Sequence, residues 1–265
     1  MQFKHFAAVA FATIALAQGV KAQTNFQTFY DFAGDRGHVT TTLEGFYGDK
    51  WGNTFFFIDY DYKNKVDDKV VSPNGTYFEI ARCLNFWQES KIGAFSLQVE
   101  YNGGIYNAYS INNAFLVGVD YFLHNSDFSN TFNFKLLYKH INYAGARDFD
   151  GDKLKSKLPL QFTFVWGMQD LFGVKGLRFS GFADFWGERH LVAPVTDDEA
   201  ASYRDWAEGK YVDFVFISEP QIWYNVGQFF GCENLNVGGE VELSYDFGSG
   251  KGFHARPCAG FKWVF

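Results

Sequence analysis

The segment Asn53-Thr-Phe-Phe-Phe-Ile-Asp-Tyr-Asp-Tyr62 alternates with a period of two residues. One parity holds Thr54, Phe56, Ile58, Tyr60 and Tyr62, and the other holds Phe55, Phe57, Asp59 and Asp61. Successive side chains of a β-strand point to opposite faces, so this segment predicts a strand with one apolar, aromatic face and one mixed face.

The same alternation recurs along the chain, in segments separated by clusters of Gly, Asn, Asp and Ser. We expect twelve strands, at residues 25–33, 38–47, 53–62, 75–86, 92–102, 109–123, 128–142, 157–168, 176–187, 211–226, 235–246 and 253–265. Compact connectors at one end are predicted at 48–52, 87–91, 124–127, 169–175 and 227–234. The opposite end carries 34–37, 63–74, 143–156, 188–210 and 247–252, which include the longest connectors.

This pattern fits two architectures. In a soluble sandwich the apolar face covers a core, whereas in a membrane barrel it faces lipid and the polar face lines a lumen. Aromatic residues make up 21% of the chain, and Phe265 ends it at the apolar parity of a strand. Both features, and the even strand number, favour the barrel. The predicted fold is all-β, a transmembrane antiparallel up-and-down barrel of about twelve strands.

The first 22 residues have the pattern of a secretory signal peptide. Lys4 precedes the apolar stretch Phe6–Ala17, and Val20-Lys21-Ala22 places small residues before a cut at Gln23. The alternative is an N-terminal anchor, but the stretch is shorter than the roughly 20 residues that a spanning helix needs. We therefore expect a signal peptide at 1–22 and one barrel domain at 23–265, in the outer membrane of a Gram-negative bacterium.

Composition excludes several function classes. Asp and Glu number 30 against 23 Lys and Arg, which argues against a nucleic-acid partner. Cys83, Cys232 and Cys258 allow at most one disulfide and lack metal-ligand spacing. The chain contains no His-Glu-x-x-His, Gly-x-Ser-x-Gly or phosphate-loop motif, so we expect no enzyme activity, no metal and no cofactor.

The mixed face of the predicted strands supplies candidate lumen residues. Rings can stack on a flat solute, and carboxylates can accept hydrogen bonds from its hydroxyls. The alternative is that these charges pair across the lumen and fill it. The candidate solute-binding residues are Phe55, Phe57, Asp59, Asp61, Glu79, Glu100, Arg178, Asp184, Trp223, Glu240, Glu242 and Arg256. Further charges of the same parity are Asp120, Lys135, Lys139, Glu219, His254 and Lys262.

Two local motifs suggest other chemistry. Asp148-Phe-Asp150-Gly-Asp152 resembles the start of a calcium loop, but its twelfth position is Pro159 instead of Glu. A solvated outer loop is the favoured interpretation, with weak divalent binding as the alternative. His124-Asn125-Ser126 has the His-x-Ser spacing of an outer-membrane phospholipase, but it falls in a compact turn, where a lipid-facing nucleophile would be misplaced.

Several segments, in order, resemble the Tsx family of nucleoside-specific channels. They are Leu43–Phe46 leading into Asp49–Gly52 and Phe55–Tyr60, then Tyr77–Arg82, Phe164–Gly173, Phe179–Gly187 and the closing Gly248–Phe265. The resemblance implies a twelve-stranded outer-membrane channel that passes nucleosides. Its partners would be a nucleoside-like solute, membrane lipid and, through the strand ending in Phe265, the outer-membrane assembly machinery. The alternatives are a structural or adhesive barrel with a plugged lumen and a barrel lipid hydrolase.

Overall fold

The computed structural model describes residues 23–34, 36–62, 73–106, 110–196 and 204–265. The predicted signal peptide lies outside these residues. The strands are β1 (Gln23–Asp31), β2 (Val39–Asp49), β3 (Gly52–Tyr62), β4 (Pro73–Leu84), β5 (Phe95–Tyr106), β6 (Ser110–His124), β7 (Asn130–Ile141), β8 (Leu160–Met168), β9 (Leu177–Val192), β10 (Lys210–Ser218), β11 (Gln221–Tyr224), β12 (Leu235–Tyr245) and β13 (Phe253–Val264).

Antiparallel pairing runs without a break around the molecule. Each strand from β1 to β9 pairs with the next, and β13 returns to β1, with Phe26 opposite Trp263. β10 and β11 occupy one position, since both pair with β9 on one side and β12 on the other. Glu219 and Pro220 interrupt this position, because proline has no N–H to donate to a ladder. The result is a closed barrel with twelve strand positions, which confirms the predicted fold.

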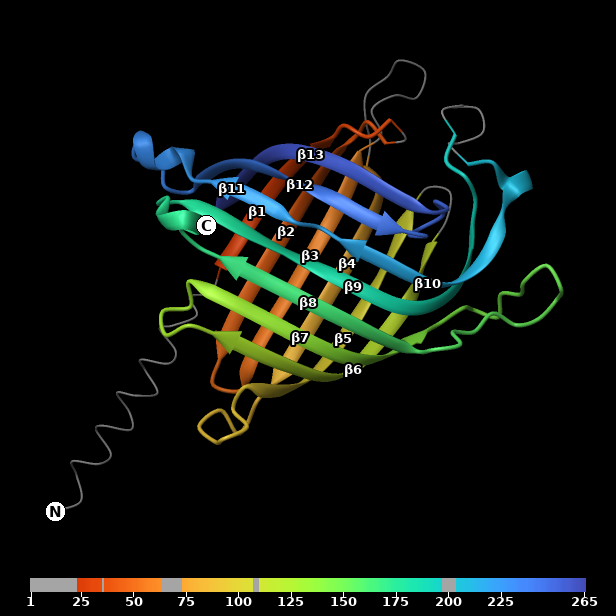
Figure 1. The fold of residues 1–265 in the computed structure, drawn as a ribbon, viewed down its shortest axis with the longest axis horizontal. Coiled ribbons are helices and arrows are strands. Elements are labelled where there is room, and N and C mark those ends of the chain that lie inside the picture. The colour runs from red at the N-terminus through yellow and green to blue at the C-terminus, as the bar shows by residue number, and fades with distance from the viewer. Residues whose placement is uncertain (1–22, 35, 63–72, 107–109, 197–203) are drawn as a thin grey trace.

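The two ends of the barrel differ in their connections (Figure 1). Gln23 and Val264 lie at the end where β2 meets β3 and β6 meets β7 through short turns. The opposite end carries residues 142–159 between β7 and β8 and the β9–β10 connection. Predicted boundaries agree with the strands to within a few residues. The main differences are that the strand expected at 92–102 runs from Phe95 to Tyr106 and that β9 continues to Val192.

Apolar side chains face outward and polar side chains face inward, the reverse of a soluble protein. On β5, Val99 is 47% exposed whereas its neighbour Gln98 is 0% exposed. The outer faces of the other strands carry exposed rings and aliphatic side chains such as Phe134, Phe162 and Phe261. Such a wall suits hydrocarbon, and a closed ladder leaves no unpaired edge within it.

Helical structure in the described residues is limited to single turns. These are η1 (Leu171–Gly173), η3 (Trp206–Glu208) and η4 (Val226–Phe229). No helix in the described ranges has the length and apolar character needed to span a membrane.

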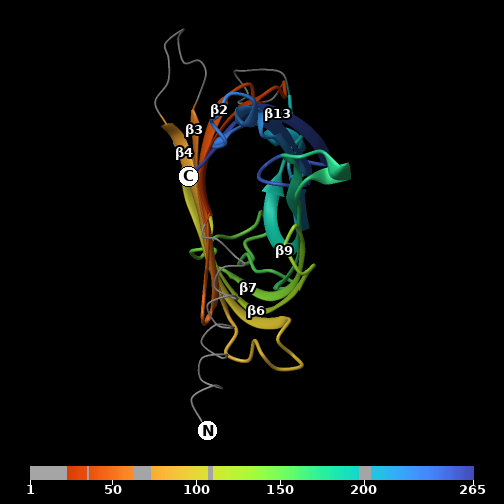
Figure 2. The ribbon, with the colours of Figure 1, turned by 90° about the vertical axis from the view of Figure 1, so that its left-hand side faces the viewer.

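The barrel is flattened in cross-section (Figure 2). Viewed from the end that holds the termini, β3 and β4 form one long wall, and β9 faces them across the interior. β6 and β7 close one narrow end, and β13 lies near the other. The interior has two parts: one lies along β3 and β4, and the other is bordered by β6, β7, β9 and β10.

Candidate solute-binding lumen

The inner face is defined by the strand registers. Asp59 on β3 lies between Thr42 on β2 and Tyr77 on β4, and Phe57 lies between Glu44 and Glu79. Following these pairs around the barrel places every candidate solute-binding residue on the inner face. They are Phe55, Phe57, Asp59, Asp61, Glu79, Glu100, Arg178, Asp184, Trp223, Glu240, Glu242 and Arg256.

Accessibility divides these residues into two groups. Trp223, Glu242 and Arg256 are buried, at 1%, 4% and 2% exposure. The other nine are half-buried, although they face the interior. Partial exposure on the inner face of a closed barrel means that space accessible to water reaches these side chains.

An aromatic strip lies on the inner face of β3 and β4. The ring centroids of Phe55 and Phe57 are 6.0 Å apart, and those of Phe57 and Tyr77 are 5.8 Å apart. The Tyr77 hydroxyl donates to Glu79 Oε1 over 2.5 Å, and the Thr42 hydroxyl donates to Asp59 Oδ1 over 2.6 Å. Ring faces and carboxylate acceptors therefore stand side by side. Together with Glu44 on β2, the residues Phe55, Phe57, Asp59, Tyr77 and Glu79 form what we call the carboxylate wall.

Other inner carboxylates also accept hydrogen bonds from neutral donors. Asn25 Nδ2 donates to Glu44 over 2.8 Å, and Gln221 Nε2 donates to Glu240 over 2.7 Å. Glu100 accepts from Gln98 over 2.7 Å and from Asn102 over 3.3 Å. These amides were not among the sequence candidates. Their parity could have identified them, because they lie on the same faces as the carboxylates.

Asp61 stands nearer the long-loop end than the rest of the strip. It accepts from the Thr40 hydroxyl over 2.6 Å and from the Tyr106 hydroxyl over 2.9 Å. His38 Nε2 lies 3.7 Å from its Oδ1. Of the candidate carboxylates on β3, it has the fuller set of partners.

Glu242 and Arg256 form a buried ion pair. Arg256 Nη1 lies 2.5 Å from Glu242 Oε1, and Arg36 Nη2 lies 2.6 Å from Glu242 Oε2. The Ser244 hydroxyl adds a third donor over 2.7 Å. For these two residues the structure supports the alternative interpretation, in which charges pair and fill the interior.

Two candidates on β9 contain buried atoms without a hydrogen-bond partner. They are Nε of Arg178 and Oδ1 of Asp184. Arg178 is paired in register with Trp223 on β11, and Asp184 with Ile217 on β10. Buried polar atoms without a partner are rare in folded proteins. Where they occur, a bound water or ligand is one explanation.

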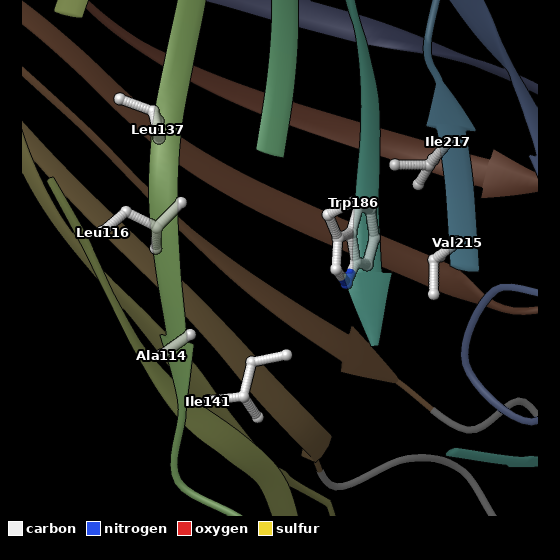
Figure 3. Close-up of a cluster of buried hydrophobic side chains, with 7 residues drawn as sticks. All are labelled: Ala114, Leu116, Leu137, Ile141, Trp186, Val215 and Ile217. Carbon is white, nitrogen blue, oxygen red and sulfur yellow. The ribbon is translucent and has the colours of Figure 1, made fainter. Parts of the chain in front are cut away.

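Apolar side chains from β6, β7, β9 and β10 gather in one part of the interior (Figure 3). Tyr143, Phe182 and Phe247 pack against this group, and the rings of Trp186 and Phe247 lie 6.2 Å apart. We call it the apolar cluster, and its buried members are Ala114, Leu116, Leu137, Ile141, Trp186, Val215 and Ile217.

The long-loop end is held together by ion pairs and backbone contacts. Arg189 lies 3.1 Å from Asp213 and 3.5 Å from Asp148. Ala193 in the β9–β10 connection bridges Gly250 in the β12–β13 connection. Burial raises the pKa of Tyr143, whose hydroxyl accepts from the Arg189 N–H, to about 12. These contacts fix three outer connections to one another.

In the segment that resembles a calcium loop, the Asp148 carboxylate is used in hydrogen bonds within the loop. Asp148 Oδ1 accepts from the N–H groups of Asp150 and Asp152, over 3.1 and 3.0 Å. In the described residues, no group of three or more His, Cys, Asp or Glu side chains has the arrangement of a metal site. Cys83, Cys232 and Cys258 are all free thiols.

His124 lies at the end that holds the termini. Its ring stacks on Phe128, with centroids 3.9 Å apart, and Nδ1 lies 2.7 Å from the carbonyl oxygen of Asn125. Within the described chain, no hydrogen bond joins His124 to Ser126. The arrangement therefore lacks the contact between base and nucleophile that a serine hydrolase needs.

One family matches nearly the whole chain. Its profile, described as a domain of unknown function (DUF5020), matches residues 17–265. The chain belongs to this family. No curated protein matches the sequence of this DUF5020 protein. The matched family carries no described function, so the resemblance to the Tsx family stays a prediction.

The solved structure of one outer-membrane porin, NanC, shares the fold of this DUF5020 protein. The NanC porin is 9% identical, with a TM-score of 0.53 over 91% of this chain and 98% of that chain. The KdgM porin, solved in complex with disordered oligogalacturonate, is 9% identical, with a TM-score of 0.47 over 92% and 99%. At such low identity the likeness to NanC shows the fold alone.

Proposed function

We propose that the protein is an outer-membrane channel through which small polar solutes diffuse, with nucleosides as the first candidates. The observation that carries this proposal is the partial exposure of the carboxylate wall on the inner face of a barrel whose outer face is apolar. The fold shared with porins and the resemblance to the Tsx family support it.

The carboxylate wall offers both kinds of contact that a nucleoside needs. A base can stack on Phe57 or Tyr77, which contributes about 1–3 kcal/mol per base in single-strand binding proteins. The ribose hydroxyls can donate to Asp59 and Glu79, whose oxygens each retain free lone pairs. Contacts of this size are weak enough for a solute to leave again, as conduction requires.

We further propose that the two ends of the sequence direct export and membrane insertion. Residues 1–22 would act as a signal peptide and direct the barrel to the outer membrane. Phe265 is 71% exposed, and its N–H donates to the Thr24 carbonyl oxygen over 2.9 Å, next to the β1–β13 seam. An exposed aromatic side chain beside the closing seam is suited to recognition during assembly. Outside, an apolar groove of about 480 Å³, lined by rings such as Phe95, Phe134 and Phe164, is suited to lipid chains.

The test is the current through the purified protein in a planar lipid bilayer, with and without adenosine. We expect stepwise currents that adenosine reduces. Phe57→Ala should weaken this block, because a stacking surface is lost. Phe149→Ala is the matched control, since Phe149 is 73% exposed in an outer loop. Currents that ignore adenosine would contradict the nucleoside assignment while leaving the channel intact.

A plugged structural barrel is the second candidate, and the apolar cluster favours it. Trp186 and Phe247 fill interior space that an open channel would leave to water. If this packing closes the whole lumen, the inserted protein will carry no current at all. The same bilayer measurement therefore separates the two functions.

A further inference from the structure

Two lysines of the inner face, Lys139 and Lys262, are held against its wall. Lys139 Nζ lies 4.1 Å from the Trp186 ring centroid and donates to Gln161 Oε1 over 2.8 Å. Lys262 Nζ lies 4.4 Å from the Trp223 ring centroid and 3.4 Å from Gln221 Oε1. Their exposures are 7% and 5%. Each ammonium group therefore contacts an indole and an amide, and little of either side chain is accessible from the lumen.

The arginines beside β12 are neutralised by acids. Arg256 pairs with Glu242, and Arg36 bridges Glu242 and Asp31. Glu242, Asp31 and Arg256 are all buried. This network leaves no accessible positive charge at Arg256.

The accessible carboxylates, in contrast, are not neutralised by ion pairs. Asp59, Glu79 and Glu240 accept hydrogen bonds from a threonine, a tyrosine and a glutamine, respectively. Glu44 and Glu100 accept from amides only. In the described ranges, none of these five residues forms an ion pair. Neutral donors orient these carboxyl groups without supplying a compensating positive charge.

Glu219 adds a further carboxyl group where the strand position is interrupted between β10 and β11. Its N–H donates to the Phe182 carbonyl oxygen over 3.0 Å, which fixes the backbone. Its carboxylate is half-buried and has no hydrogen-bond donor among the described residues. The charged groups that act on it are Glu240, Glu242 and Asp59, with Arg36 acting in the opposite direction.

Lys135 and Arg178 are the half-buried cations of the inner face, and acids accompany both. Asp120, Glu100 and Asp184 are the carboxylates that act most strongly on Lys135, and Glu44 acts on Arg178. Three carboxylates therefore act on Lys135, whereas a single carboxylate acts on Arg178.

From this asymmetry we infer that the lumen selects solutes by charge, admitting cationic and neutral donors and excluding anions. Asp59, Glu219 and Glu240 are the specificity-determining residues. The inference rests on the proposed function, since it requires an open channel. Carboxylates in low-dielectric walls focus the field and concentrate cations. An ammonium group would also find the faces of Phe57 and Tyr77, which attract cations. The chemical class is therefore a small amine or polyhydroxyl compound, and not a sugar acid.

The first test is ion selectivity in a planar bilayer under a KCl gradient. We expect K⁺ to be preferred over Cl⁻ by several-fold, up to about tenfold. Glu240→Gln and Glu219→Gln should each lower this ratio. Glu89→Gln, at an exposed position in the β4–β5 connection, is the matched control and should leave it unchanged. A preference for Cl⁻, or a ratio that the two lumen variants do not alter, would overturn the inference.

The second test uses three hexoses of equal size in a liposome-swelling assay. Galactosamine is cationic, galactose is neutral and galacturonate is anionic at neutral pH. We expect swelling rates to fall in that order, with galacturonate several-fold slower than galactose. Swelling that is fastest with galacturonate would contradict the charge selection alone. Absence of swelling with all three, together with absence of current, would contradict the channel function itself.

Discussion

The carboxylate wall and the apolar cluster occupy the same inner face of one barrel, yet they differ in packing. On β3 and β4, Phe57 and Glu79 are half-buried and border accessible space. In the apolar cluster, Leu137 on β7 and Trp186 on β9 are 0% and 8% exposed. An inward-facing side chain is therefore not necessarily accessible from the lumen. Where the flattened barrel brings its walls together, inner side chains form a core.

The largest expected effect is on stability, from loss of a ring in the apolar cluster. Trp186→Ala should lower the free energy of unfolding by about 3–5 kcal/mol, because a buried ring and its contact with Lys139 disappear. Phe57→Ala should lower the free energy of unfolding by only about 1 kcal/mol, because it removes contacts with neighbouring rings. Urea unfolding in lipid vesicles, followed by gel mobility without boiling, measures both. Equal losses would remove the distinction between the two regions.

The outer face should respond alike beside both regions. Phe134 on β7 and Ile80 on β4 are 48% and 39% exposed on the lipid side. Replacing either with Lys should destabilise the barrel by about 2–4 kcal/mol if it lies near the middle of the bilayer. The same unfolding assay applies. A large cost at one position and none at the other would show that the lipid-facing wall is not continuous.

The smallest effect is expected for a lysine on the inner face. Asn133 neighbours Phe134 but faces inward, where its amide donates to both oxygens of Asp120 over 3.0 and 2.9 Å. Asn133→Lys keeps a donor to Asp120, so it should cost under about 1 kcal/mol. If it destabilises as much as Phe134→Lys, the assignment of the two faces on β7 is wrong.

Much of the barrel was predictable because alternation encodes which face each side chain occupies. The segment Phe55–Asp61 alone predicts the inward parity of its rings and carboxylates, and the strand number follows from repeated alternation. The break at Pro220 was not predicted. The surrounding pattern continues through it, and only the pairing of β10 and β11 with the same neighbours shows the interruption.

The contacts between side chains inside the barrel depend on how the barrel closes, so they could not be predicted from the sequence. Whether Arg256 meets a solute or Glu242 is decided by the β12–β13 register, which places the two side by side. Phe247 lies in a loop without periodicity, so nothing in the sequence indicates that it contacts Trp186. The alternation of residues does not identify the solute either, because rings and carboxylates of this kind suit several classes of solute.

The most direct test of a water-filled lumen beside a dry apolar cluster is the reactivity of cysteines placed at two inner positions. With Cys83, Cys232 and Cys258 replaced by serine, Phe57→Cys and Leu137→Cys are each treated with a cationic and an anionic methanethiosulfonate reagent in intact membranes. We expect Phe57→Cys to react, faster with the cationic reagent, and Leu137→Cys to react with neither. Equal reaction at both positions, or no reaction at Phe57→Cys, would contradict a water-filled, electronegative lumen beside a dry apolar cluster.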